Sequence, residues 1–221
     1  MRSLAQTNVL IKAAVAAMIT SLAAYPRLAS WTERNGAVGF FLLMLLWTTF
    51  VLWSFVFGWH ERYSGEGVFK ASTSLKLWGL ASLAGMAGAI LLMLVVDPQL
   101  RVTTPKDYPV DLKSWANMGL FTLSFDPLFL CFAPFAFFIR LFRKPKIATV
   151  LTVLFGVFVL YLKLSSANRL PAMWLVAVLA LMRVAGGFVM VYVYLQGGAL
   201  PVFWMGVLVE LRHLVLLFGE R

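Results

Sequence analysis

The strongest constraint on this chain is that apolar runs long enough to cross a lipid bilayer fill nearly all of its 221 residues. A bilayer core about 30 Å thick requires about 20 consecutive apolar residues in a helix that rises about 1.5 Å per residue. Hydrophobic residues make up 62% of the chain, which leaves too little polar surface for a water-soluble domain. The sequence therefore predicts an all-α, polytopic membrane protein with a single domain over residues 1–221.

Seven such runs can be separated along the chain. They cover residues 9–25, 37–59, 77–96, 118–139, 147–162, 172–195 and 202–218. We expect the first to end at Pro26 and the third at Asp97 and Pro98, because proline lacks a backbone donor and clashes with the preceding helical turn. The fourth run contains Pro127 and Pro134, so its helix should be kinked or locally unwound.

The chain is strongly basic, with a net charge of +10. Its basic residues lie mostly in short connections between apolar runs, which favours lipid headgroups over nucleic acid as partners. The densest cluster follows the fourth run and consists of Arg140, Arg143, Lys144 and Lys146. Lysine and arginine collect in cytoplasmic loops. This cluster therefore predicts a protein of the cell (inner) membrane with a cytoplasmic N-terminus and a C-terminus on the far side.

Motifs for catalysis and metal binding are absent from the sequence. There is no glycine-rich phosphate loop and no His-Glu-x-x-His motif. The two histidines, His60 and His213, cannot form a multi-histidine zinc site within one copy. His213 is a candidate axial ligand for a haem or pigment in the membrane, and the alternative is a hydrogen-bonded packing residue. The single cysteine, Cys131, excludes an intramolecular disulfide.

A small set of polar residues lies inside the apolar runs: Asp126, Arg183, Glu210, Arg212 and His213. Such groups are costly to bury in a bilayer and require partners. Counted from the turn between the last two runs, Arg183 lies roughly 18 Å deep and Glu210 roughly 13 Å deep, so an ion pair is expected, with Asp126 nearby. Arg212 should point to another face, toward a partner chain or a lipid phosphate. Such a network either fixes helix packing or forms a proton or substrate path.

Small residues recur four apart in the third run, at Ala81, Gly85 and Ala89. In a membrane, small side chains let the backbone of a neighbouring helix approach closely. We therefore expect this stripe to pack against another helix, either from the same chain or from a separate subunit.

The C-terminal half also shows an ordered pattern of motifs. A basic turn, "RLFRKPK", precedes a helix with Phe155 in "LTVLFGVFVL", and then Gly187, Tyr192 and Tyr194 occur in "GGFVMVYVYLQGGALP". Over residues 118–218 this order resembles the CPBP family of intramembrane proteases, also called the CAAX protease and bacteriocin-processing or Abi family. The resemblance implies a CPBP-like helical bundle in this half of the chain.

The resemblance also implies a catalytic centre built on Glu-Glu-x-x-x-Arg, Phe-x-x-x-His and His-x-x-x-Asn. The corresponding positions hold Asp126 and Pro127, Cys131, Val159, and Gly206 or Val207. Activation of water in a membrane needs a base and a group that orients or polarises the water, and Asp126 supplies at most the base. We therefore expect a pseudoenzyme that kept the fold and does not cleave prenylated or leader peptides.

These observations predict a non-catalytic membrane protein. Its expected role is an accessory or structural subunit of a larger membrane complex, or a binder of lipid or a hydrophobic cofactor, with membrane lipids and other membrane subunits as partners. One alternative is a CAAX-type protease that uses Asp126 or Glu210 as a non-standard base. The other is a small transporter, which should show paired broken helices from an internal repeat, whereas this sequence has one strongly broken helix.

Overall fold

A computed structural model of the protein describes residues 3–31, 35–70, 73–105, 108–165 and 171–219. Within these residues the secondary structure is helical, and seven segments are long and apolar enough to cross a membrane. They are Thr7–Ser30, Ala37–Ser64, Leu75–Val102, Leu112–Phe142, Pro145–Ser165, Met173–Gly197 and Ala199–Phe218. The prediction of an all-α, multi-pass membrane protein is confirmed.

Three of the spanning segments change from α-helical to π-helical geometry for a short stretch and then continue. The second consists of α2 (Asn35–Phe55), the π segment η1 (Val56–His60) and α3 (Glu61–Ser64). The third consists of α4 (Leu75–Leu91), η2 (Leu92–Val96) and α5 (Asp97–Thr103). The fourth consists of α6 (Leu112–Pro127), η4 (Leu128–Phe132) and α7 (Ala133–Phe142). The others are α1 (Thr7–Trp31), α8 (Pro145–Ser165), α9 (Met173–Gly197) and α10 (Ala199–Gly219).

Two of the predicted helix ends are wrong. Pro26 lies inside α1, and Pro98 is the second residue of α5, so neither proline ends its span. Pro98 directly follows η2, as Pro134 directly follows η4. In a π turn the backbone N–H bonds to the carbonyl five residues earlier, and this wider turn makes room for the proline ring. The distortion expected near Pro127 and Pro134 therefore takes the form of a π segment, and the helix stays continuous.

Local capping by side chains starts two of the helices, α4 and α6. The side chain of Ser74 accepts a hydrogen bond from the Leu77 backbone N–H at 3.4 Å, which starts α4. At α6, Asp111 accepts a hydrogen bond from the Ser114 N–H at 2.6 Å, and the Ser114 hydroxyl accepts one from the Asp111 N–H. These hydrogen bonds lower the pKa of the exposed Asp111 carboxyl. The capping box also explains why the fourth span begins six residues before the predicted residue 118.

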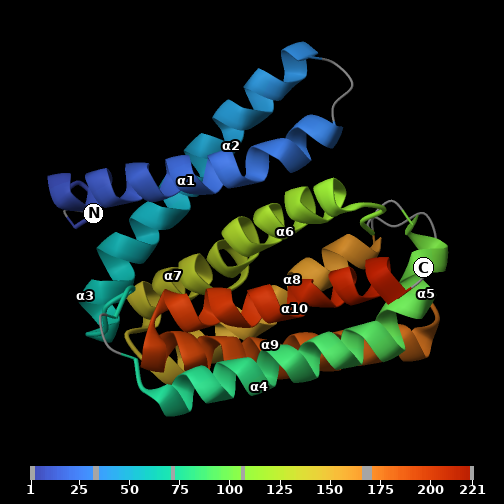
Figure 1. Ribbon diagram of the computed structural model, residues 1–221. Helices are drawn as coiled ribbons and strands as arrows, with labels where there is room; N and C mark the ends of the chain where they lie inside the picture. Colours follow the sequence, from blue (N-terminus) through green and yellow to red (C-terminus); the bar gives the residue numbers. More distant parts are fainter. Residues whose placement is uncertain (1–2, 32–34, 71–72, 106–107, 166–170, 220–221) are drawn as a thin grey trace.

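The spans form a bundle with one outlying hairpin. Figure 1 shows α4, α6, α9 and α10 running side by side, with α8 behind them, while the start of α2 stands away from the bundle. Helix α1 packs on α2 and α6, and α4 packs on α10. The two termini lie at opposite ends of the bundle, as an odd number of spans requires. We call these the N-terminal end and the C-terminal end.

At the N-terminal end, the loop before α4 is hydrogen-bonded to the turn between α9 and α10. The Lys70 ammonium donates hydrogen bonds to the backbone carbonyls of Leu195 at 2.8 Å and Gln196 at 3.1 Å, and it also pairs with Glu66 at 2.6 Å. A cation bound to the last carbonyls of a helix satisfies acceptors that have no partner within the helix and complements the helix dipole. These contacts of Lys70 therefore fix the end of α9 and the start of α10.

Substituting Gly198 with alanine should destabilise this turn. Gly198 has φ +75°, and an added Cβ would lie 2.6 Å from the Val68 carbonyl oxygen, which accepts a hydrogen bond from Ala199. We expect Gly198→Ala to lower stability by about 1–3 kcal/mol, measured by thermal unfolding in mild detergent. The control is Gly39→Ala, where an added Cβ meets nothing within 4 Å and alanine favours the helix. Equal melting temperatures for the two variants would contradict the described turn.

Candidate functional site

A buried ion pair joins α5 to α10 near the C-terminal end. The Arg212 Nε donates a hydrogen bond to Asp97 Oδ2 at 3.0 Å, and Asp97 is only 2% exposed. The Nη1 of the same guanidinium donates to the Val209 carbonyl at 2.8 Å and lies 4.0 Å from Glu210 Oε1. One arginine thus links two acidic side chains from different spans.

The loop after α5 completes this arrangement. The Tyr108 hydroxyl donates a hydrogen bond to Asp97 Oδ1 at 3.0 Å, and its ring contacts His213 edge to face at 5.6 Å between centroids. The Arg101 guanidinium lies 5.4 Å from the centre of the same ring. Burial, together with the neighbouring Asp97 carboxylate, raises the pKa of Tyr108 above its usual value, so the phenol stays protonated and remains a donor. The residues of this Asp97 cluster are Asp97, Arg101, Tyr108, Glu210, Arg212 and His213.

Two polar side-chain atoms of the Asp97 cluster, on Glu210 and His213, make no hydrogen bond to the described residues. Glu210 Oε2 and His213 Nδ1 are buried and have no hydrogen-bond partner among the described residues. The Trp115 indole N–H instead donates to the backbone carbonyl of Glu210 at 3.1 Å. Buried polar atoms in proteins are nearly always hydrogen-bonded, so these two atoms mark a place where a further polar group fits.

The expected ion pair between Arg183 and Glu210 is not formed. Glu210 lies near Arg212 of its own helix, whose long side chain folds back along α10. Arg183 lies against Gly156 of α8 and forms no ion pair or hydrogen bond within the described residues. The prediction failed because depth along two helices can be matched by counting residues, whereas the faces they present depend on packing.

Asp126 is also separate from the Asp97 cluster in its immediate contacts. It lies in the last turn of α6 and is within electrostatic range of Arg183 from α9 and Lys163 from α8. Across the described part of the chain, no three His, Cys, Asp or Glu side chains lie together as a metal site would require. This carboxylate therefore lies near two cations, and it is also within electrostatic range of Glu210 from the Asp97 cluster.

Sequence reasoning missed Asp97 and Tyr108. Asp97 was interpreted as the end of a helix and Tyr108 as part of a surface connection, and nothing local to either residue signals a buried hydrogen bond. It also missed His60, which is fully buried at the end of η1 with both ring nitrogens unpartnered among the described residues. The His60 ring lies 4.6 Å from that of Tyr194, far along the chain, so only the tertiary structure brings them together.

The predicted headgroup cluster lies at the turn between α7 and α8. The Arg140 and Arg143 guanidinium groups lie 5.2 Å and 5.8 Å from the centre of the Tyr63 ring, which is within the range of cation–π interactions. Lys144 and Lys146 are exposed beside them. All four are at the N-terminal end of the bundle, opposite the Asp97 cluster.

The predicted small-residue stripe packs against α10 of the same chain. Ala81 is fully buried, and a Cβ added to Gly85 would lie 2.9 Å from the Met205 carbonyl oxygen and 3.0 Å from Leu208 Cβ. Ala89, one turn further on, lines a groove between the two helices. At Gly85 the backbone of α4 therefore lies against both the backbone and a side chain of α10.

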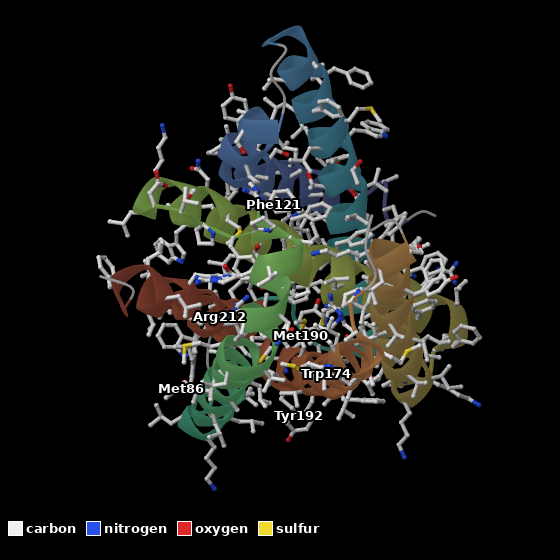
Figure 2. The ribbon with its side chains drawn as sticks, turned by 90° about the vertical axis from the view of Figure 1, so that its right-hand side faces the viewer. Met86, Phe121, Trp174, Met190, Tyr192 and Arg212 are labelled. Atoms are coloured by element: carbon white, nitrogen blue, oxygen red, sulfur yellow. The ribbon has the colours of Figure 1, made fainter. Side chains whose placement is uncertain are left out.

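Two grooves are open on the surface of the spans. The hairpin groove has a volume of about 340 Å³ and is lined by Ala16, Ile19, Thr20, Ala23, Trp53, Phe69, Leu120, Leu123, Ser124, Phe203 and Val207. The Arg212 groove has a volume of about 260 Å³ and is lined by Met86, Ala89, Ile90, Met93, Leu208, Leu211, Arg212 and Val215. Figure 2, which views the C-terminal end, shows Met86 on α4 beside Arg212 on α10.

The charged clusters and the grooves differ in their chemical character. Asp97 is bonded to Arg212 and Tyr108, and Asp126 lies near two cations. The grooves present almost only hydrocarbon, which is the surface that acyl or terpenoid chains contact. No protein-family model, no curated protein and no solved structure matches this chain.

Proposed function

We propose that this protein is a non-catalytic membrane protein that holds a lipid or a hydrophobic cofactor in the hairpin groove. The observation that carries the proposal is the composition of this groove. Helices α1, α2, α6 and α10 all contribute to it, and its lining is apolar except for the hydroxyl groups of Thr20 and Ser124 and the indole N–H of Trp53. Its volume of about 340 Å³ lies within the range of about 300–1,000 Å³ that is typical of small-molecule sites.

The wall of the hairpin groove is held in place by polar contacts that need no ligand. The Trp53 indole N–H donates a hydrogen bond to the Thr20 hydroxyl at 3.0 Å, which ties α2 to α1. Ser21 and Thr49 make a second contact between the same helices, at 3.3 Å between their hydroxyl oxygens. These polar side chains of α1 and α2 are already hydrogen-bonded to each other. The groove therefore keeps its shape without a ligand, and an apolar molecule bound there would contact hydrocarbon and no reactive group.

An accessory role in a larger membrane complex is supported by a different feature. Helix α2 exposes Phe40, Phe41 and Trp47, and the start of this helix stands away from the bundle in Figure 1. In a bilayer such a face contacts lipid chains or a helix of another subunit. A bound lipid or cofactor in the hairpin groove, which lies beside this helix pair, would be part of such an assembly.

The proposal is tested by filling the groove. Wild-type protein released from mild detergent in native mass spectrometry should carry an apolar adduct, which extraction and lipid analysis would identify. Ala23→Phe, inside the hairpin groove, should remove most of that adduct. The matched control is Leu22→Phe, because Leu22 is exposed on the same turn of α1 and lies outside the groove.

Two outcomes would contradict the proposal. One is adduct-free wild-type protein, or equal adduct in the Ala23→Phe variant and the control. The other is hydrolysis of a prenylated peptide by the purified protein that disappears in Asp126→Asn, which would instead make Asp126 a catalytic base. The first result would argue against ligand binding, and the second against the absence of catalysis.

A further inference from the structure

Three arginines at the N-terminal end of the bundle gather around one aromatic ring. The guanidinium groups of Arg140 in α7 and of Arg143, which directly follows α7, lie 5.2 Å and 5.8 Å from the centre of the Tyr63 ring. Arg62, the residue before Tyr63 in α3, lies 5.9 Å from the same centre. Helices α3 and α7 contact each other at this end of the bundle (Figure 1). We call Arg62, Arg140 and Arg143 the arginine cluster.

No acidic side chain of the described residues neutralises the arginine cluster. Its three guanidinium groups form no ion pair or hydrogen bond within this part of the chain. The acidic residues described at the same end are Glu61 and Glu66, which pair with Lys12 at 3.9 Å and with Lys70 at 2.6 Å. Like charges held around one ring repel each other unless an anion lies among them. The cluster therefore has both charge and N–H donors left for an anionic ligand.

The backbone holds one of these arginines in a conformation that glycine would adopt at lower cost. Arg143 has φ +53°, the one positive φ among the described residues other than glycine. Its N–H donates to the Ile139 carbonyl at 2.9 Å and ends α7, a position where helices usually have glycine. This left-handed turn keeps the arginine side chain beside Tyr63. Strained backbone of this kind points to a functional role for the side chain that it positions.

The arginine cluster lies at the height of the lipid headgroups. Arg62 is close to the end of the span Ala37–Ser64, and Arg140 and Arg143 flank the end of the span Leu112–Phe142. Between and beside these arginines, Leu141, Phe142 and Ile147 are exposed by 56%, 46% and 38%. Apolar side chains exposed at the end of a span contact acyl chains, so charged groups at the same level meet headgroups.

We propose that the arginine cluster binds the headgroup of an anionic phospholipid, whose phosphate accepts hydrogen bonds from the guanidinium groups. The planar guanidinium matches phosphate oxygens in geometry and charge. Lys144 and Lys146 are exposed on the adjoining turn and add two positive charges, which favours a lipid of net negative charge over zwitterionic phosphatidylcholine. The site is distinct from the hairpin groove, whose lining carries no charge, so either proposal can fail without the other.

Native mass spectrometry in an uncharged detergent tests this preference. The probes are phosphatidylglycerol and phosphatidylcholine with the same acyl chains, titrated separately into the full chain. The wild type should bind phosphatidylglycerol more tightly. The double variant Arg140→Gln, Arg143→Gln should reduce the ratio of the two affinities by roughly 25-fold, about fivefold for each arginine. A lipid in the uncharged hairpin groove would leave this ratio unchanged.

The matched control removes two cations from outside the cluster. Lys76→Gln, Lys113→Gln changes the net charge by the same amount, and both lysines are exposed. This variant should keep the preference for phosphatidylglycerol close to that of the wild type, because neither lysine belongs to the cluster around Tyr63.

A second variant separates lipid binding from folding. Arg143→Gly removes one guanidinium and places glycine at the positive φ, so the melting temperature in lipid-free detergent should stay equal or rise. The preference for phosphatidylglycerol should nevertheless fall about fivefold. A residue that served only the turn would give the opposite result, with no change in lipid preference.

Three results would overturn the proposal. One is equal affinity of the wild type for the two phospholipids. Another is an equal loss of preference in the arginine and lysine double variants, which would assign the effect to net charge and not to the cluster. The last is binding of inorganic phosphate as tight as that of phosphatidylglycerol, which would make the ligand a soluble anion.

Discussion

Replacing Arg212 with glutamine should destabilise the folded protein by about 3–5 kcal/mol, because the Asp97 carboxylate would then be buried without its cation. The hydrogen bond from Tyr108 to Asp97 would remain, but it supplies no compensating charge. The double variant Asp97→Asn, Arg212→Gln removes both charges and should cost less than Arg212→Gln alone. Unfolding by sodium dodecyl sulfate in mixed micelles, followed by circular dichroism, measures these differences.

Arg183, a second arginine inside an apolar run, provides the control for this prediction. Arg183 makes no ion pair or hydrogen bond in the described part of the chain, and Asp97 is not among its electrostatic neighbours. The effects of Arg183→Gln and Asp97→Asn should therefore add within about 0.5 kcal/mol, as those of independent sites do. If the Asp97 and Arg212 effects were equally additive, the pair that joins α5 to α10 would not exist in solution.

Replacing Gly85 with leucine should also be strongly destabilising, by about 3 kcal/mol. The added side chain would meet the Met205 carbonyl and Leu208 Cβ at distances where one helix has to move. Overpacking of this kind costs at the upper end of its usual range when the obstructing atom is backbone. The protein should still insert into the membrane, since the apolar length of α4 is unchanged. Thermal unfolding in mild detergent measures the loss.

Gly79 provides the control for this prediction, because it lies on the same helix and an added Cβ there meets nothing within 4 Å. Gly79→Leu should therefore leave the melting temperature close to that of the wild type. Similar melting temperatures for Gly79→Leu and Gly85→Leu would contradict the close contact between α4 and α10. A selective loss at Gly85 would show that the stripe serves intrachain packing.

The number and type of spans were predictable from the sequence for a simple reason. A bilayer requires each crossing segment to be apolar over its whole length and to satisfy its own backbone hydrogen bonds, so composition alone selects helices of a minimum length. The small residues at Ala81 and Gly85 were recognisable as a contact face by the same kind of local rule, because a helix places residues four apart on one side. What they contact was left open.

The ends of the spans were less predictable. Pro26, Asp97 and Pro98 resemble stop signals, yet their helices continue. A π segment before Pro98 absorbs the steric conflict, and no composition rule applied to the sequence indicated where such a segment forms. The predicted loop from Asp97 onward thus begins as a further helical stretch that carries a buried acid.

Only the tertiary structure decided which charges meet. The sequence determined that Asp126, Arg183, Glu210 and Arg212 lie within the membrane, since their positions in apolar runs fix their depth. It could not determine the rotation of each helix about its axis, which depends on how all the side chains of the bundle fit together. That rotation turns Arg183 toward Gly156 and brings Arg212 to Asp97, from a span more than a hundred residues away in sequence.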